Sequence, residues 1–287
     1  MPTELSVGLA EPVRQQGIGV VAPFDFALDR ELWRWVPDDV SLYLTRLPFF
    51  TTPVTVEMAV ACGDRRAVRR ATRDVLTPEP AVVAYACTSG SFVDGAAGEL
   101  VLRRTMVDAG APAACTTSGA LIDALAALGV ARLAIATPYV EPVTRRLVGY
   151  LAEYGVRTVS CEGLGLLGHI WRVTYAEVVE IVRAVDTDTA DALFISCTNL
   201  PTYDLIEPLE QALGKPVLTA NQVTMWAALR AMGRVAVGRG SLLDTGAAAE
   251  VQLTTTAPAE LTAVPDPPAP VEIGPTRISA VRPAGAA

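Results

Sequence analysis

Two cysteines occupy matching positions in the sequence. Cys87 begins the triplet Cys-Thr-Ser directly after the apolar run 81–86, and Cys197 begins Cys-Thr-Asn directly after the apolar run 192–196. Two thiols in one site can remove a proton from one face of a carbon and return a proton to the other face. Alternatively, one thiolate can add covalently to a substrate while the second thiol supplies a proton. Neither chemistry needs a metal or an organic cofactor, so we expect none.

The matched context is what singles out these two thiols. A lone cysteine at the end of a strand is more often a packing residue than a catalytic one, because cysteine is among the most buried residue types. Finding two at equivalent positions, each followed by threonine and a second polar residue, favours function for the pair. The other three cysteines lack this context, and we interpret Cys62, Cys115 and Cys161 as structural residues.

The elements that must position the thiols follow an alternating pattern. Short runs rich in valine, isoleucine and alanine alternate with longer amphipathic segments, which is typical of an α/β protein whose parallel sheets are covered on both faces. A capping-box signal, Thr174 with Glu177, marks the start of one helix. The expected strands are 17–22, 40–44, 81–86, 132–137, 156–160 and 192–196, and the expected helices include 29–36, 141–154 and 175–185.

The α/β pattern occurs twice along the chain. Three pairs of segments recur in the same order: Pro23 with Pro138, each directly after a strand; Cys87 with Cys197; and 112–129 with 216–233. Three aligned blocks indicate a duplicated unit, about 18–129 and 130–238. We predict a first domain over 17–114, joined by a returning segment 216–240, and a second domain over 115–215. An Ala/Pro/Thr-rich tail, 241–287, is expected to be mostly disordered.

The duplication suggests where the two thiols meet. Ligands of parallel α/β proteins bind at the carboxyl ends of the strands, and both Cys87 and Cys197 follow a strand. If the two halves pack with these edges facing, the thiols share one cleft. The neighbouring hydroxyl, amide and backbone N–H groups could lower a thiol pKa, hold a substrate carboxylate or stabilise a developing enolate.

Composition excludes several other kinds of site. The net charge is −8 and the pI is about 4.8, which argues against nucleic-acid partners and anionic membrane surfaces. His169 and Lys215 are the only histidine and lysine, so His-rich zinc sites, Ser-His-Asp triads and P-loops are nearly excluded. No secretion signal or membrane span is visible. We therefore expect a cytoplasmic protein with free thiols.

Four weaker signals accompany the two thiols. Residues 163–168 match GxGxxG, but the next helix is expected only near Thr174, so a flexible loop is favoured over a dinucleotide site. His169 either contacts substrate or caps a loop. Asp25 binds substrate or satisfies backbone N–H groups at a helix start. The hydroxyl of Tyr139 could donate a hydrogen bond to a bound carboxylate.

Four motifs together resemble the aspartate/glutamate racemase superfamily, over about residues 17–240. Within it, the chain is similar to the branch of maleate cis-trans isomerases, arylmalonate decarboxylases and the ectoine-utilisation protein A group. The motifs are YACTSGSF (85–92), ATPY (136–139), ISCTNLPTYDLIE (195–207) and VVAPFDFALDRELW (20–33), the last of which looks most like the ectoine-utilisation group.

The resemblance implies two pseudo-symmetric flavodoxin-like domains with parallel sheets and an active site in the cleft between them. It implies that Cys87 adds to a double bond or acts as the base on one face, and that Cys197 protonates the opposite side. In the decarboxylases glycine replaces the first cysteine, so its presence here favours isomerase or racemase chemistry. The remaining expected substrate-binding residues are Thr88, Ser89, Tyr139, Thr198, Asn199, Asp25 and Phe24.

One departure from the family pattern bears on the substrate. The isomerases carry asparagine where Asp25 stands, and a second asparagine expected near 167–169 is also missing. An ionised Asp25 would repel a dicarboxylate, so a substrate with one carboxylate and an amine, amidine or hydroxyl group is favoured over maleate.

The sequence therefore predicts a cofactor-independent isomerase or racemase of a small carboxylate, acting in ectoine-type catabolism. The alternatives are an arylmalonate-type decarboxylase that uses Cys197 alone and a non-catalytic small-molecule binding protein of the same fold. We expect a homo-oligomer, either a dimer or a tetramer.

Overall fold

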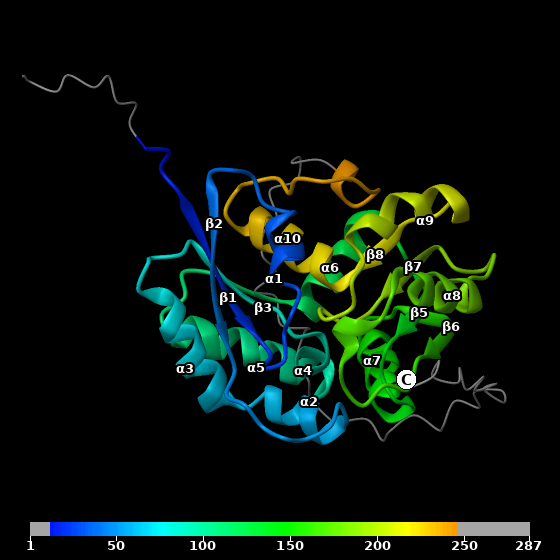
Figure 1. The fold of residues 1–287 in the computed structure, drawn as a ribbon, viewed down its shortest axis with the longest axis horizontal. Helices are drawn as coiled ribbons and strands as arrows, with labels where there is room; N and C mark the ends of the chain where they lie inside the picture. Colours follow the sequence, from blue (N-terminus) through cyan, green and yellow to red (C-terminus); the bar gives the residue numbers. More distant parts are fainter. Residues whose placement is uncertain (1–11, 246–287) are drawn as a thin grey trace, which may run out of the picture. The chain divides into compact units, whose positions relative to one another are not determined.

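The computed structural model describes residues 12–245, and within them the chain forms two four-stranded parallel sheets (Figure 1). The first sheet has the order β2-β1-β3-β4 and the second has the order β6-β5-β7-β8, so each strand of one sheet has a counterpart in the other. This confirms the α/β class and the pseudo-symmetric pair of parallel sheets. The strands are β1 (Gln16–Ala22), β2 (Val40–Arg46), β3 (Val82–Tyr85), β4 (Ala114–Thr116), β5 (Arg132–Thr137), β6 (Arg157–Gly163), β7 (Ala192–Ile195) and β8 (Val217–Thr219).

Helices cover the sheets, as the continuous apolar strand sequences require. Every residue of β3 and β7 is buried, which is typical of central strands in a parallel sheet. The helices are α1 (Asp29–Trp33), α2 (Val56–Cys62), α3 (Arg65–Leu76), α4 (Thr88–Phe92), α5 (Gly95–Asp108), α6 (Thr117–Leu128), α7 (Glu141–Glu153), α8 (Tyr175–Val185), α9 (Ile206–Leu213) and α10 (Ala220–Ala231). Short 3-10 turns span Ile170–Arg172, Tyr203–Leu205 and Leu243–Thr245.

Helix α10 lies late in the chain but packs on the first sheet. It contacts α6, β3 and β4 (Figure 1). Its residues Met225, Ala228 and Leu229 belong to the same core cluster as Ile18 and Val82 of the first sheet. The predicted domain boundaries include such a returning segment, 216–240. The boundaries themselves stay a prediction.

Several element ends differ from those expected. The first helix ends at Trp33 rather than Val36. Pro37 follows, and a proline disfavours helical backbone at the residue before it, so Arg34 and Trp35 close the segment with shorter turns to Glu31 and Leu32. Helix α8 begins as predicted, with the complete capping box of Thr174 and Glu177.

The predicted tail overlaps the described residues at 241–245. Leu242 is fully buried and Leu243–Thr245 form a 3-10 turn, so this part of the segment is structured. The rest of the predicted tail, 246–287, lies outside the described residues.

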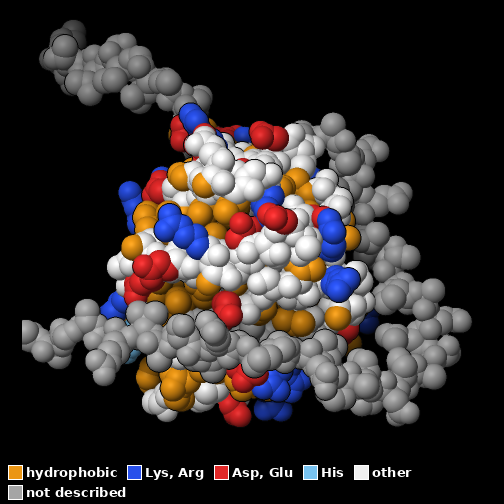
Figure 2. Space-filling view, turned by 90° about the vertical axis from the view of Figure 1, so that its right-hand side faces the viewer, with side chains coloured by type: hydrophobic (Ala, Val, Ile, Leu, Met, Phe, Trp, Pro, Cys, Tyr) orange, Lys and Arg blue, Asp and Glu red, His pale blue; other side chains and the backbone are white. Residues whose placement is uncertain are grey.

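Two properties of the described chain bear on its surroundings. Within residues 12–245, no helix is both long enough and apolar enough to cross a membrane. On the face shown in Figure 2, acidic and basic side chains are interspersed rather than gathered into a basic patch.

A buried carboxylate in the first half binds Thr202 of the second half and Asn221 of the returning helix α10. Glu31 on α1 accepts hydrogen bonds from the backbone N–H of Thr202 at 3.0 Å, from the Thr202 hydroxyl at 2.9 Å and from Nδ2 of Asn221 at 3.0 Å. Burial raises the pKa of Glu31, and these hydrogen bonds oppose the rise. Because all three partners are donors, they fit an ionised carboxylate.

We predict that Glu31→Ala lowers the free energy of unfolding by about 3 kcal/mol, because three buried donors lose their acceptor. Urea denaturation followed by circular dichroism measures this value. Glu180→Ala, at an exposed position on α8, is the matched control and should change stability little. Equal stability of the two variants would show that the Glu31 contacts do not fasten the halves together.

Candidate active site

The two halves meet around one small cavity at the carboxyl ends of their strands. It encloses about 20 Å³, which is space for about one water molecule. The lining residues are Pro23, Asp25, Val54, Met58, Cys87, Thr88, Ser89, Tyr139, Ile170, Cys197, Thr198 and Asn199.

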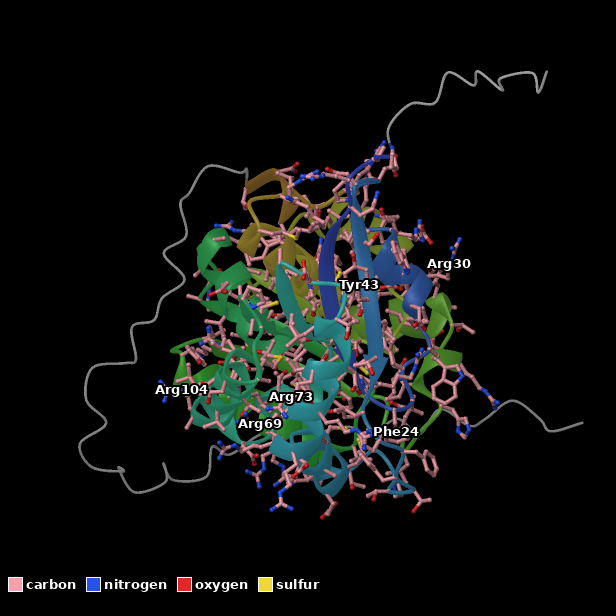
Figure 3. The ribbon with its side chains drawn as sticks, turned by 90° about the vertical axis from the view of Figure 1, so that its left-hand side faces the viewer. Phe24, Arg30, Tyr43, Arg69, Arg73 and Arg104 are labelled. Atoms are coloured by element: carbon pink, nitrogen blue, oxygen red, sulfur yellow. The ribbon has the colours of Figure 1, made fainter. Side chains whose placement is uncertain are left out.

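Most of the predicted site residues line this cavity. Both cysteines do, together with Thr88, Ser89, Tyr139, Thr198, Asn199 and Asp25. Phe24 is the exception. It is labelled in Figure 3, and its ring packs against Phe49 and Phe50, with centroid separations of 5.5 and 4.5 Å. The turn after β1 thus presents Asp25 to the cavity and sends Phe24 to a neighbouring aromatic cluster.

Cys87 lies at the junction between β3 and α4. It is two residues past the end of β3 and forms the N-cap of α4, with extended backbone and a side chain only 4% exposed. Its Sγ lies 4.0 Å from Oγ of Ser89. The strand-to-helix junction therefore points the sulfur at the cavity and brings a hydroxyl beside it.

Cys197 holds the equivalent position after β7 with a different backbone. Its φ is +94°, a conformation that residues with a side chain rarely adopt. Its Sγ accepts a hydrogen bond from the backbone N–H of Asn199 at 3.4 Å. Strained backbone persists only where the surrounding structure enforces it, and such positions cluster at functional sites.

The environment of Cys87 favours the thiolate. Its pKa is lowered, first by the neighbouring Cys62 thiol and then by the Gly90 N–H. Burial and the nearby Asp25 carboxyl oppose this effect. Cys87 is thus the thiol of the pair that ionises first.

The environment of Cys197 favours the neutral thiol. Burial raises its pKa to about 12, and the charges of Asp25 and Cys87 add to the increase. Hydrogen bonds from the Tyr139 hydroxyl and the Asn199 N–H act in the opposite direction. The two pKa values are therefore shifted in opposite directions, that of Cys87 toward the thiolate and that of Cys197 toward the thiol, as a base and an acid require.

No lysine, arginine or histidine is among the residues that line the cavity. Burial raises the pKa of Asp25, while its own backbone N–H and the Asn199 side chain lower it. The Thr88 hydroxyl is buried without a hydrogen-bond partner within residues 12–245. A bound carboxylate would therefore be held by neutral donors, of which the Thr88 and Ser89 hydroxyls are the available ones.

Asn199 reaches across to the first half of the chain. Its Oδ1 accepts a hydrogen bond from the N–H of Ala27 at 2.9 Å, and its Nδ2 donates to the carbonyl of Asp25 at 3.0 Å. The amide is thereby committed to holding the turn that carries Asp25. The sequence predicts Asn199 as a substrate contact, which stays a prediction; it lines the cavity, and its side chain also holds the turn that carries Asp25.

Two of the weaker sequence signals, 163–168 and His169, fall outside the cavity. Residues 163–168 form the end of β6 and an irregular connection, and the next α-helix starts only at Tyr175. His169 is exposed, has a φ of +54° and packs its ring against Trp171. Neither contributes to the residues that line the cavity.

Four apolar lining residues were not predicted as site residues from the sequence. Pro23 follows β1, Val54 precedes α2, Met58 lies within α2, and Ile170 comes from the 3-10 turn after β6. The N–H of Val54 donates to the carbonyl of Leu167 at 2.9 Å, which joins these two distant segments beside the site. No sequence signal distinguishes these side chains from ordinary core residues.

Comparison with known proteins places these features in context. The family described as arylmalonate decarboxylase matches residues 64–243. Arylmalonate decarboxylase of Bordetella bronchiseptica is 37% identical over 171 residues, covering 57% of this chain and 71% of that protein. Maleate isomerase of Nocardia farcinica is 30% identical over 215 residues, covering 71% of this chain and 84% of that protein.

A solved structure shows the same architecture. The maleate cis-trans isomerase of Nocardia farcinica, as a cysteine-to-serine mutant with a covalently bound succinylcysteine intermediate, superposes with a TM-score of 0.71 at 26% identity. It covers 79% of this chain and 98% of that one.

Fold and site thus define a protein of two flavodoxin-like halves that present one cysteine each to a shared cavity. The chain belongs to the arylmalonate decarboxylase family, and maleate isomerases are also among its relatives. The closer kinship with the ectoine-utilisation group stays a prediction.

Proposed function

We propose that this protein is a cofactor-independent isomerase of a small carboxylate, with Cys87 as the nucleophile or base and Cys197 as the acid. One observation carries the proposal: two thiols from opposite halves line one cavity, and their pKa values are shifted in opposite directions. An isomerase of this type needs one sulfur that attacks and one that donates a proton.

The cis-trans reaction needs only these two groups. The Cys87 thiolate adds to one alkene carbon, and Cys197 gives its proton to the other, so a C–S bond and a C–H bond form while the C=C π bond breaks. Rotation follows about the resulting single bond. The Cys197 thiolate then removes the proton from that carbon, the C=C bond forms again, and the C–S bond breaks to release the Cys87 thiolate.

Racemisation would use the same pair without the covalent bond. The Cys87 thiolate removes a proton from the carbon beside the carboxylate, and the Cys197 thiol protonates the opposite face. Hydroxyls and backbone N–H groups of Thr88, Ser89 and Thr198 would bind the carboxylate and stabilise the enediolate. The protonation states at rest are the same for both reactions, so the substrate decides between them.

The relatives support isomerase chemistry in two ways. Maleate isomerase is the activity named for a relative that aligns over 71% of this chain, and a succinylcysteine intermediate is seen in a structure of that protein. The decarboxylases of the family carry glycine in place of the first cysteine, whereas Cys87 is present here. We place the reaction in a reducing cytoplasm, where free thiols persist.

The charge of the cavity narrows the substrate class. Asp25 faces the cavity without a basic partner among the lining residues, so a dianion meets a repulsive carboxylate whenever Asp25 is ionised. A substrate with one carboxylate and an amine, amidine or hydroxyl group could instead pair its polar group with Asp25. An ectoine-related compound would have this chemistry.

We predict that turnover is accompanied by exchange with solvent and requires both thiols. Candidate substrates incubated in D2O should gain deuterium at the reacting carbon, as followed by NMR. Cys87→Ser and Cys197→Ser should each lower kcat by at least about 100-fold, because proton transfer by a positioned group contributes that much or more.

Cys161→Ser is the control, since Cys161 lies on β6 and does not line the cavity. It should retain full exchange and turnover. Full activity in both single variants of Cys87 and Cys197 would overturn the proposal, and ligand binding without any exchange would point to a non-catalytic binding protein.

Decarboxylation is the second candidate, favoured by the 37% identity to a decarboxylase. The raised pKa of Cys197 suits the thiol that protonates an enediolate after CO2 is lost. The apolar residues Val54, Met58 and Ile170 would also destabilise a carboxylate placed against them. CO2 release from an arylmalonate that survives Cys87→Gly would select this function over isomerisation.

We predict that Asp25→Asn improves the use of a dicarboxylate such as maleate. Removing the carboxylate removes its repulsion of a dianion, and KM should fall about tenfold at pH 8. The gain should shrink as the pH falls toward the raised pKa of Asp25, because the wild-type carboxyl then becomes neutral. Asp38→Asn, at an exposed position, is the control. An unchanged KM in Asp25→Asn would show that Asp25 does not face the substrate.

A further inference from the structure

A hydrogen bond joins the two segments that carry the cavity thiols. The hydroxyl of Thr198 donates to the carbonyl of Ala86 at 3.2 Å, and both residues are buried. Thr198 directly follows Cys197 in the sequence, and Ala86 directly precedes Cys87. The bond therefore links the chain neighbours of the two sulfur-bearing residues, across the two halves of the chain.

Thr198 is held by a second hydrogen bond as well. Its carbonyl accepts from Nδ2 of Asn221 at 3.0 Å. Asn221 lies on α10, which packs on the first sheet, and the same Nδ2 also donates to Glu31. The hydroxyl and the carbonyl of Thr198 thus both bind groups that belong to the first half or pack on it.

The equivalent hydroxyl of the first half makes no such bond. The repeat that pairs the two cavity cysteines also pairs Thr88 with Thr198. It pairs Ser196 with Ala86, so the symmetric bond would run from the Thr88 hydroxyl to the carbonyl of Ser196. Within residues 12–245 the Thr88 hydroxyl is buried at the cavity without a hydrogen-bond partner. The two matching threonines therefore have different contacts, and their tasks can be separated by experiment.

The contacts decide what each threonine can offer a substrate. A hydroxyl carries one proton, so a hydroxyl that already donates has none for a second acceptor. The proton of Thr198 is committed to Ala86, which leaves Thr198 only its backbone N–H as a donor to a carboxylate. The hydroxyl of Thr88 is free to donate.

We propose that Thr198 is a positioning residue, whose hydroxyl holds the turn of Cys197 against the turn of Cys87 and so fixes how acid and nucleophile face one substrate. Misplacing a reacting group by about 1 Å can cost about 100-fold in rate. The consequence for catalysis rests on the proposed function, in which both thiols react. The hydrogen bond itself is a property of the free protein.

Steady-state kinetics with maleate as the probe substrate separate positioning from binding. Thr198→Val should lower kcat at least about tenfold and leave KM within about twofold, because the thiols lose their alignment while the substrate-binding groups remain. Thr88→Val, at the matching position, should instead raise KM about tenfold, because a donor to the carboxylate is lost. Thr198→Ser keeps the hydroxyl and should retain the wild-type kcat.

Amide hydrogen exchange measured by mass spectrometry tests the bond without substrate. In Thr198→Val, the peptides that contain Cys87 and Cys197 should exchange about fivefold faster than in the wild type, because losing a buried hydrogen bond favours local opening. Thr77→Val, at an exposed position after α3, is the control and should leave this exchange unchanged. If Thr198→Val does not fold, Thr198→Ala removes the same hydroxyl and takes its place.

Three results would overturn the proposal. The first is a kcat of Thr198→Val equal to that of Thr77→Val. The second is a rise in KM alone, which would show that the Thr198 hydroxyl binds the substrate. The third is an equal loss in Thr198→Val and Thr198→Ser, which would show a packing role rather than a hydrogen bond.

Failure of this inference is distinguishable from failure of the proposed function. Hydrogen exchange needs no substrate, so in a protein inactive toward every carboxylate, unchanged exchange in Thr198→Val would still reject the role of Thr198. Conversely, an enzyme that loses turnover in the variants of Cys87 and Cys197 but keeps it in Thr198→Val would retain the proposed function and reject the role of Thr198.

Discussion

Negative charge buried without a cation is the constraint on which the site depends. Three acidic groups, Asp25, Cys87 and Cys197, line one cavity of about 20 Å³, and no basic residue lines it with them. Each added charge raises the cost of the next one. One negative charge in the cavity therefore costs less free energy than two. The lowered pKa of Cys87 places that charge on its sulfur. Cys197 and Asp25 are pushed toward their protonated forms by the same burial.

The duplicated fold turns this constraint into an acid–base pair. Equivalent strands β3 and β7 each end two residues before a cysteine, so the symmetry of the chain delivers two sulfurs to one place. The surroundings then make them unequal. Cys87 caps a helix and meets a third thiol, whereas Cys197 sits on strained backbone beside Tyr139. Hydrogen bonds at Glu31 and at Asn199 join the two halves. These contacts hold Cys87 and Cys197 in place relative to each other.

The repeat explains how much of this could be predicted from the sequence. Cys87, Cys197 and Tyr139 were found because strand ends and their following turns are local features that recur in both halves. The direction in which a side chain points from a turn depends on residues distant in the sequence. Phe24 packs against Phe49 and Phe50 and does not line the cavity. The helix was predicted to span 29–36 because the apolar pattern continues to Val36. The observed helix α1 ends at Trp33, ahead of Pro37.

Residues from α2 could not be predicted at all. Met58 reaches the cavity and Cys62 packs beside Gly90 only because α2 packs against α4, and nothing in the sequence of α2 specifies that neighbour. Cys62 was interpreted as a structural cysteine, and its burial agrees with that interpretation. Its position beside Gly90 of α4 is a property of the tertiary packing.

The central claim is that the two cavity thiols are in opposite protonation states. Alkylation with iodoacetamide across a series of pH values, with each cysteine-containing peptide quantified by mass spectrometry, tests it directly, because both sulfurs line the same cavity. The account predicts that Cys87 is labelled with a midpoint below the ordinary thiol pKa of 9.0, while Cys197 stays unlabelled over the same range. Labelling of both cysteines with one midpoint, or of Cys197 first, would contradict it.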